Sequence, residues 1–147
     1  MSTDGDRDRD RHGRETSHGG VVVRGDDLVV IVPRGKRRTL ALPKGGPNDG
    51  ETGAQTAARE VREETGITAE HVSELGEVRY WYRRGGRRIL KTVHFHLFRY
   101  VSGDTADHDH EVEDARWIPL RDARTALSYP GEREMIERAL SKLALDR

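Results

Sequence analysis

The chain has 147 residues with 26 basic and 26 acidic side chains, so its formal net charge is zero. This length suits one globular domain, and the charge balance gives no overall attraction to nucleic acid or an anionic membrane. Cysteine is absent, which excludes disulfides, thiolate nucleophiles and zinc–sulfur sites. The sequence has no apolar stretch near the roughly 20 residues of a membrane helix, and no hydrophobic signal core. We therefore expect a cytoplasmic protein.

The N-terminal segment is highly charged. Residues 1–18 contain no aliphatic side chain after Met1, and aspartate alternates with arginine from Asp6 to Arg11. Such a segment buries too little apolar surface to offset its ordering entropy. We expect residues 1–18 to be a disordered tail and residues 19–147 to form a single domain. A basic arm that grips phosphates is disfavoured, because the acids of this segment outnumber its arginines.

Runs of β-branched or alternating apolar residues predict six strands. They lie at residues 19–24, 28–32, 39–43, 72–83, 88–101 and 116–119. The first two flank Gly25, Asp26 and Asp27, which predicts a hairpin, and the two longest are joined at Gly85 and Gly86. The chain ends in a segment with one apolar helical face.

A helix is predicted between Thr52, as its N-cap, and Gly66, as its C-cap. Small and apolar residues at helical spacing form one narrow stripe, suited to packing on a sheet. They are Ala54, Ala57, Ala58, Val61 and Thr65. Strands precede, interrupt and follow the helices without a regular βαβ repeat. This order favours an α+β fold, with a mixed sheet between helices, over a doubly wound parallel sheet.

Three glutamates gather on one arc of this helix. At about 100° per residue, Glu60 and Glu64 fall about 40° apart, and Glu63 lies about 60° beyond Glu60. Like charges at this spacing destabilise a helix by a few tenths of a kcal/mol, and a bound cation removes the penalty. Oxygen ligands without cysteine or histidine on the helix favour Mg²⁺ or Mn²⁺ over zinc. The alternative is an ordinary solvated acidic face.

The segment around these glutamates resembles a known motif. Nine specified residues recur over 23 positions: Gly45, Glu51, Arg59, Glu60, Val61, Glu63, Glu64, Gly66 and Ile67. They match the Nudix box at every defined position. The strand order around them also resembles that family from about Gly19 to the C-terminus. The resemblance implies a Nudix-type α/β/α sandwich with a mixed β-sheet and a loop–helix–loop catalytic motif.

The resemblance implies a metal site and its ligands. In the family, the carboxylates that correspond to Glu60 and Glu64 are direct ligands of Mg²⁺ or Mn²⁺. Glu63 would ligate directly or through water, and the Gly45 carbonyl would complete the sphere. Glycine suits this position because the backbone must approach the metal closely.

The general base remains open between Glu63 and Glu111. In some relatives a glutamate from the equivalent loop, ahead of a strand with a tryptophan such as Trp117, reaches the metals. Glu111 would then be both a ligand and a catalytic residue. The alternative is an ordinary acidic loop, because five other acids surround it. Arg59 would pair with Glu51 and support the loop.

Substrate residues are also implied by the resemblance. Lys44 before the box glycine is similar to the branch of dinucleoside polyphosphate hydrolases, such as diadenosine tetraphosphate hydrolases, and of diphosphoinositol polyphosphate phosphohydrolases. Lys91 resembles a second lysine of that branch, and ammonium groups beside a polyphosphate stabilise charge on the leaving phosphate. Tyr82 and Tyr129 resemble positions that stack on an adenine. Arg84, at an arginine-rich hairpin tip, either contacts distal phosphates or keeps the turn soluble.

These observations predict a magnesium-dependent hydrolase that cleaves a phosphoanhydride in substrates linked to a nucleoside diphosphate. Dinucleoside polyphosphates are the leading substrate class. A nucleotide-pool hydrolase acting on NTPs or oxidised dNTPs, and an inositol-pyrophosphate hydrolase, are alternatives on the same scaffold. A nucleotide- or RNA-binding module is disfavoured, because the box keeps all its glutamates and no RNA-stacking motif accompanies the arginines. The expected partner is a small nucleotide, and monomer and homodimer both remain open.

Overall fold

The structure is a computed structural model that describes residues 12–145. Its elements are β1 (His12–Arg24), β2 (Asp27–Pro33), β3 (Lys44–Gly45), α2 (Gly53–Thr65), β4 (Ile67–Arg84), β5 (Arg87–Gly103), η1 (Thr105–Asp107), β6 (Val112–Pro119), α3 (Ala123–Ala126) and α4 (Pro130–Leu145). No helix in this part of the chain has the length and apolar character needed to cross a membrane.

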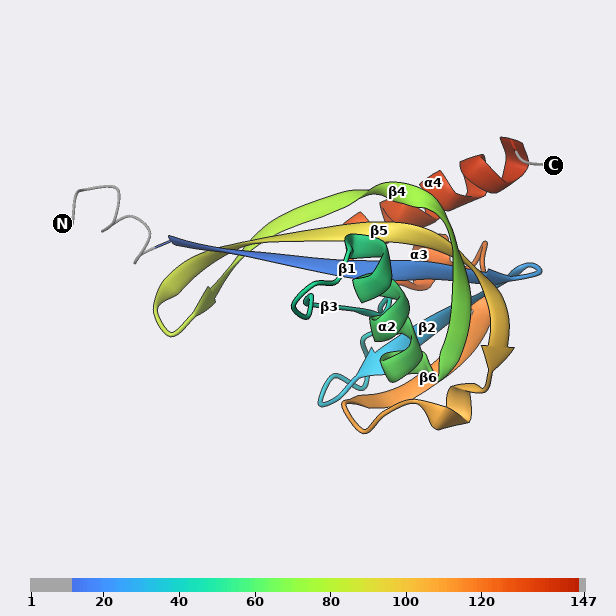
Figure 1. The fold of residues 1–147 in the computed structure, drawn as a ribbon, viewed down its shortest axis with the longest axis horizontal. Coiled ribbons are helices and arrows are strands. Elements are labelled where there is room, and N and C mark those ends of the chain that lie inside the picture. Colours follow the sequence, from blue (N-terminus) through green and yellow to red (C-terminus); the bar gives the residue numbers. More distant parts are fainter. Residues whose placement is uncertain (1–11, 146–147) are drawn as a thin grey trace.

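A six-stranded mixed sheet forms the centre of the molecule. Its strands follow the order β4-β5-β1-β2-β6, and β3 pairs with β1 beside this path. β1 runs parallel to β5, whereas its pairings with β2 and β3 are antiparallel, as are those of β2 with β6 and β4 with β5. Figure 1 shows β1, β4 and β5 extending past the other strands as a long ribbon.

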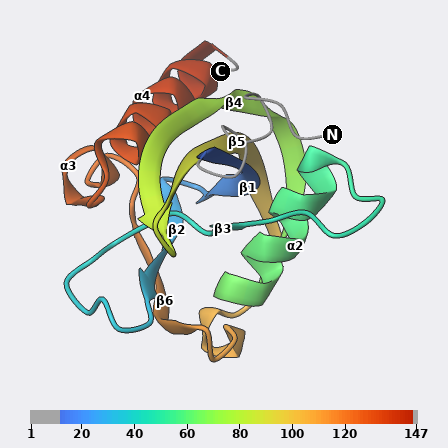
Figure 2. The ribbon, with the colours of Figure 1, turned by 90° about the vertical axis from the view of Figure 1, so that its left-hand side faces the viewer.

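Helices cover both faces of the sheet and complete the predicted α/β/α sandwich. α2 packs Ala57 and Val61 on one face, in a cluster that includes Phe98 of β5. α4 packs Met135 and Ile136 on the other face, where the larger core cluster lies. Figure 2 shows α2 and α4 on opposite sides of the strands.

Local signals in the sequence set the ends of α2 as predicted. The Thr52 side chain accepts a hydrogen bond from the Gln55 backbone N–H, and the Gln55 side chain accepts one from the Thr52 N–H. Gly66 ends the helix with φ of 76°, a left-handed conformation that glycine adopts without a steric cost. A Cβ on Gly20 would lie 2.6 Å from Val61 Cγ2, so this glycine lets β1 and α2 approach closely.

The predicted hairpins are present. β1 and β2 meet at a turn containing Gly25, with φ of 60°. β4 and β5 meet at Gly85 and Gly86, whose φ values of 57° and 79° are those that a two-residue hairpin turn requires. The predicted strands at 72–83, 88–101 and 116–119 are parts of β4, β5 and β6, which extend further.

Two sequence-based expectations were wrong. Residues 12–18 are not a disordered tail, because they form the first half of β1 and pair with β5 from His12 opposite Arg88 to His18 opposite His94. The remainder of the expected tail, residues 1–11, lies outside the described residues. Residues 39–43 form only an isolated bridge, at Ala41, and the short strand β3 follows them.

Candidate active site

The box begins where β3 leads toward α2, and its first glycine contacts a box glutamate. Gly45 lies in β3, opposite His18 of β1. A Cβ on Gly45 would fall 2.1 Å from Glu60 Cδ, so a larger residue there would displace the Glu60 carboxylate. Burial raises the pKa of Glu60, while the neighbouring Arg59 lowers it and the charges of Glu63 and Glu111 raise it. Burial thus disfavours the ionised form of Glu60, and a neighbouring cation stabilises it.

Glu64 is the most buried of the three box glutamates on α2. Its Oε1 accepts a hydrogen bond from the Lys44 backbone N–H at 2.9 Å, which joins β3 to the helix. Burial raises the pKa of Glu64 to about 8, the Lys44 contacts oppose this shift, and the charges of Glu60 and Asp109 add to it. Two carboxyls that both resist ionisation, beside a backbone loop, suit a divalent cation with oxygen ligands.

Arg59 holds the box together, and its expected ion pair with Glu51 is present. Its Nε donates to Glu51 Oε2 at 2.8 Å and its Nη2 to the Gly46 carbonyl at 2.7 Å. The hydrogen bond from Arg59 is the main reason that the pKa of Glu51 is held at about 2. Nη1 lies 2.8 Å from Glu60 and 3.2 Å from Glu63. Within residues 12–145, no three histidine or acidic side chains are already placed to hold a metal ion together. The Arg59 guanidinium contacts the carboxylates of both Glu60 and Glu63.

The loop before β6 lies against the C-terminal half of α2. The Asp109 backbone N–H donates to the Glu63 carbonyl at 2.8 Å, and the Glu111 N–H donates to Asp109 Oδ1 at 3.0 Å. The charge of Glu111 contributes to the raised pKa of Glu60. The fold therefore brings Glu111 toward the box glutamates, and its role as ligand or base remains a prediction.

Four of the five sequence-predicted substrate residues line one cavity of about 810 Å³ on the other face of the sheet. They are Lys44, Lys91, Tyr82 and Tyr129. The cavity lies between β4, β5 and the start of α4, and Lys44 links it to Gly45 and the acidic helix. Arg84 is not among the lining residues, and it pairs with Glu15 of β1.

Sequence reasoning missed two acids near this cavity. Glu132, in the first turn of α4, lines the cavity although it is only 4% exposed, and its Oε1 accepts a hydrogen bond from the Leu42 N–H at 2.8 Å. Burial raises the pKa of Glu132 to about 7. Glu15 contacts Tyr82 and Lys91 from the segment that was expected to be disordered. A single acid in a strand or helix gives no local signal of such contacts.

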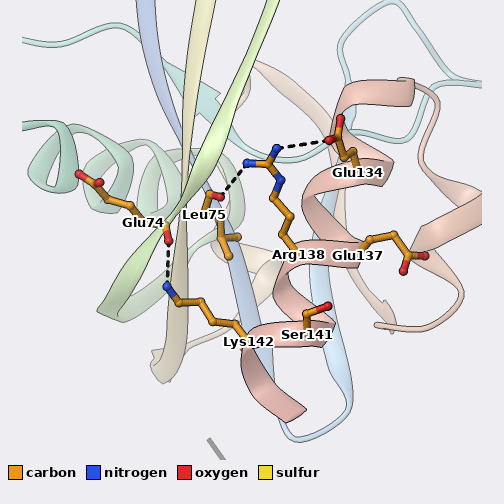
Figure 3. A pocket seen from close by; sticks show the side chains of 7 residues that line it. All are labelled: Glu74, Leu75, Glu134, Glu137, Arg138, Ser141 and Lys142. Carbon is orange, nitrogen blue, oxygen red and sulfur yellow. Dashed lines mark hydrogen bonds and ion pairs between the residues drawn. The ribbon is translucent and has the colours of Figure 1, made fainter. Parts of the chain in front are cut away.

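A second cavity, of about 540 Å³, lies away from the box, between β4 and α4. Figure 3 shows Arg138 and Lys142 reaching from α4 toward β4. Arg138 donates to the Leu75 carbonyl at 3.1 Å and Lys142 to the Glu74 carbonyl at 3.4 Å. These bonds fasten α4 to the sheet, so we interpret the cavity as part of a helix–sheet contact.

The NUDIX domain model matches residues 14–139 of the chain. The chain belongs to the NUDIX family. Two relatives agree with this. One, from Mycobacterium tuberculosis (strain CDC 1551 / Oshkosh) and named as mutator protein MutT4, is 42% identical over 132 residues, which are 84% of this chain and 53% of the relative. The other, an 8-oxo-(d)GTP phosphatase of Mycolicibacterium smegmatis, is 34% identical over 136 residues, which are 92% of this chain and 39% of that protein.

Solved NUDIX structures share the fold. A NUDIX hydrolase from Nitrosomonas europaea matches with a TM-score of 0.71 at 23% identity, over 88% of this chain and 90% of that one. An Ap4A hydrolase from C. elegans matches with a TM-score of 0.64 at 20% identity, over 88% of this chain and 98% of that one. At these identities the likeness concerns the fold alone.

The comparisons confirm the predicted family. They do not place the chain in the dinucleoside polyphosphate branch, because the curated relatives are named for mutator and 8-oxo-(d)GTP phosphatase proteins. The chain also spans only about half, or less, of the length of those relatives. NUDIX hydrolases generally use divalent cations such as Mg²⁺, and the oxygen donors on α2 and β3 fit such an ion.

Proposed function

We propose that this chain is a Mg²⁺- or Mn²⁺-dependent hydrolase of a phosphoanhydride bond in a small nucleotide, with nucleoside triphosphates of the nucleotide pool, oxidised ones included, as the first substrate class. One observation carries the proposal. The half-buried carboxyls of Glu60 and Glu64 lie against Gly45 and Lys44 of β3, and Lys44 also lines a cavity with two tyrosines. The names of the two relatives support this substrate class.

The box residues would hold the cation, with Glu60, Glu64 and the Gly45 carbonyl as ligands and with Glu63 and Glu111 nearby. A bound Mg²⁺ neutralises phosphate charge and lowers the pKa of a water. Glu60 and Glu64 are arranged for this because their ionised forms, disfavoured by burial, become stable beside a cation. Either Glu63 or Glu111 then accepts a proton from the attacking water.

The cavity would orient the substrate. Tyr82 and Tyr129 offer aromatic surfaces for a base, whereas Lys44, adjacent to the box, suits the phosphates. Lys91 lines the same cavity but has a carboxylate, Glu15, 3.5 Å away. This position favours a role for Lys91 near the nucleoside rather than at the bond that is cleaved.

Dinucleoside polyphosphates are the second candidate class. Lys44 directly before Gly45 supports it, because this lysine resembles the branch that acts on such substrates. A longer polyphosphate would also leave a second nucleoside outside the cavity. The two classes therefore differ in what lies beyond the phosphates.

A substrate panel with product analysis tests the proposal. The protein is incubated with Mg²⁺ and with NTPs, 8-oxo-dGTP, diadenosine polyphosphates, ADP-ribose or inositol pyrophosphates, and the products are identified by mass spectrometry. In ¹⁸O water, the labelled product reports which phosphorus was attacked. We expect a nucleoside triphosphate to have the highest kcat/KM, and Glu64→Gln to abolish turnover. Exclusive turnover of diadenosine polyphosphates would favour the second class, and no turnover of any nucleotide would refute the proposal.

A further inference from the structure

In the long ribbon formed by β1, β4 and β5, three side chains donate hydrogen bonds to the carboxylate of Glu15. Glu15 of β1 lies opposite Lys91 of β5 in the parallel register. Tyr82 Oη donates to Glu15 Oε2 at 2.5 Å, and Lys91 Nζ lies 3.5 Å from the same oxygen. Arg84 donates to the other oxygen, Oε1. The carboxylate of Glu15 therefore links β1 to side chains of both β4 and β5.

This arrangement keeps Glu15 ionised. The hydrogen bond from Tyr82 and the neighbouring cations Arg84 and Lys91 hold the pKa of Glu15 below its ordinary value, although burial opposes them. The same bond raises the pKa of the Tyr82 hydroxyl. At neutral pH the site is therefore a carboxylate that accepts from a neutral phenol and two cations.

Two of these three donors line the large cavity. Tyr82 and Lys91 are lining residues, whereas Glu15 is not among them. Glu15 pairs with both Lys91 and Arg84, so its single negative charge offsets part of the positive charge at this end of the cavity. At the other end Lys44 adjoins the box, and the acid that faces its backbone is Glu64.

We propose that Glu15 is a positioning residue, which fixes the Tyr82 ring and offsets part of the charge of Lys91, so that this end of the cavity selects the uncharged base of a nucleotide. The inference rests on the proposed function. It assigns a direction to the substrate: the base lies beside Tyr82, and the phosphates lie toward Lys44 and the box. A tyrosine held by its hydroxyl loses less conformational freedom on binding, which increases affinity for a stacked ring.

Three variants separate the two roles of Glu15. Glu15→Gln keeps an acceptor for Tyr82 but removes the negative charge, Glu15→Ala removes both, and Tyr82→Phe removes only the hydrogen bond. Glu70→Gln is the control, because Glu70 of β4 pairs with Arg99 of β5 at 3.9 Å in the same sheet and neither residue lines the cavity. Calorimetry with Mg²⁺ measures the Kd of inorganic tripolyphosphate and of an α,β-methylene nucleoside triphosphate.

The informative quantity is the Kd of tripolyphosphate divided by that of the nucleotide analogue, which reports selection of the base. We expect this ratio to fall several-fold in Glu15→Gln, because freeing Lys91 strengthens tripolyphosphate binding. In Glu15→Ala it falls further, because nucleotide affinity also drops about tenfold on loss of a charge-assisted hydrogen bond. Tyr82→Phe weakens the nucleotide without strengthening tripolyphosphate, and Glu70→Gln leaves the ratio unchanged.

A melting temperature that falls while both Kd values stay constant would mean that Glu15 only stabilises the ribbon, and would overturn the proposal. So would a wild-type protein that binds tripolyphosphate and the nucleotide analogue equally. Turnover of the substrate panel is scored separately. If the wild type prefers the nucleotide analogue through Glu15 but hydrolyses no nucleotide, the proposed function fails while the inference about Glu15 stands.

Discussion

Replacing Glu64 by glutamine changes how the stability of the metal-free protein depends on pH. The folded-state pKa of Glu64 is about 8, against an ordinary value of 4.5. Because the pKa is raised, the folded chain holds a proton that the unfolded chain releases between these values. Stability is therefore greatest below pH 4.5 and falls as pH rises toward 8. With 1.36 kcal/mol for each pH unit, the loss reaches roughly 4 kcal/mol at about pH 7.5.

Glu64→Gln cannot ionise but keeps an oxygen that accepts from the Lys44 N–H. In EDTA, we expect the variant to melt about 10 °C above the wild type at about pH 8, and within about 3 °C of it at about pH 5. Circular dichroism melts over this range measure the difference. Glu63→Gln, a neighbouring change at an exposed carboxylate, is the control and should keep the wild-type pH dependence. Parallel curves for Glu64→Gln and the wild type would refute the reasoning.

Four further predictions follow from the site. Mg²⁺ should raise the melting temperature of the wild type by relieving repulsion among the box glutamates, with the largest rise above about pH 7; a flat titration would argue against a metal site on α2. Lys44→Met should lower kcat at least about tenfold by removing a cation beside the phosphates, and unchanged steady-state kinetics would remove Lys44 from the reaction. Tyr129→Ala should raise KM about tenfold if the ring stacks on the base; an unchanged KM would exclude stacking. Burial, with smaller contributions from the neighbouring histidines His71 and His18, lowers the pKa of His96 to about 4, so stability should fall as pH drops from 6.5 toward 4. His96→Phe should lose less stability than the wild type in acid melts, and an equal loss would contradict this.

The sequence predicted α2 in full because the signals that define it are local. Thr52, Gly66 and the buried stripe at Ala57 and Val61 lie within one segment, and each acts on the segment itself. The same holds for the β4–β5 turn, where Gly85 and Gly86 supply the required dihedral angles. The family motif placed the box glutamates on this helix, and the structure supplies the burial that raises the pKa of Glu64.

The features that the sequence did not predict depend on distant partners. Residues 12–18 look like a charged tail until β5 lies beside them, and Glu15 finds its donors on strands about 70 positions away. His96 alternates with apolar residues as an outward-facing position would, yet it is only 4% exposed because both faces of β5 are covered. Glu132 is buried by its contact with Leu42, 90 residues away. Such contacts leave no pattern in the sequence near either residue.

The bond from the Leu42 N–H to Glu132, together with that from the Gly20 N–H to the Pro43 carbonyl at 3.1 Å, has a consequence for engineering. The backbone just before the box is therefore hydrogen-bonded to α4 through Glu132 and to β1 through Gly20. Transferring only the 23 motif residues to another protein would keep α2 but would lose these two hydrogen bonds, which hold the backbone before Gly45. Conversely, a substitution of Glu132 that removes its bond to the Leu42 N–H would act at a distance on the backbone that presents Lys44 and Gly45.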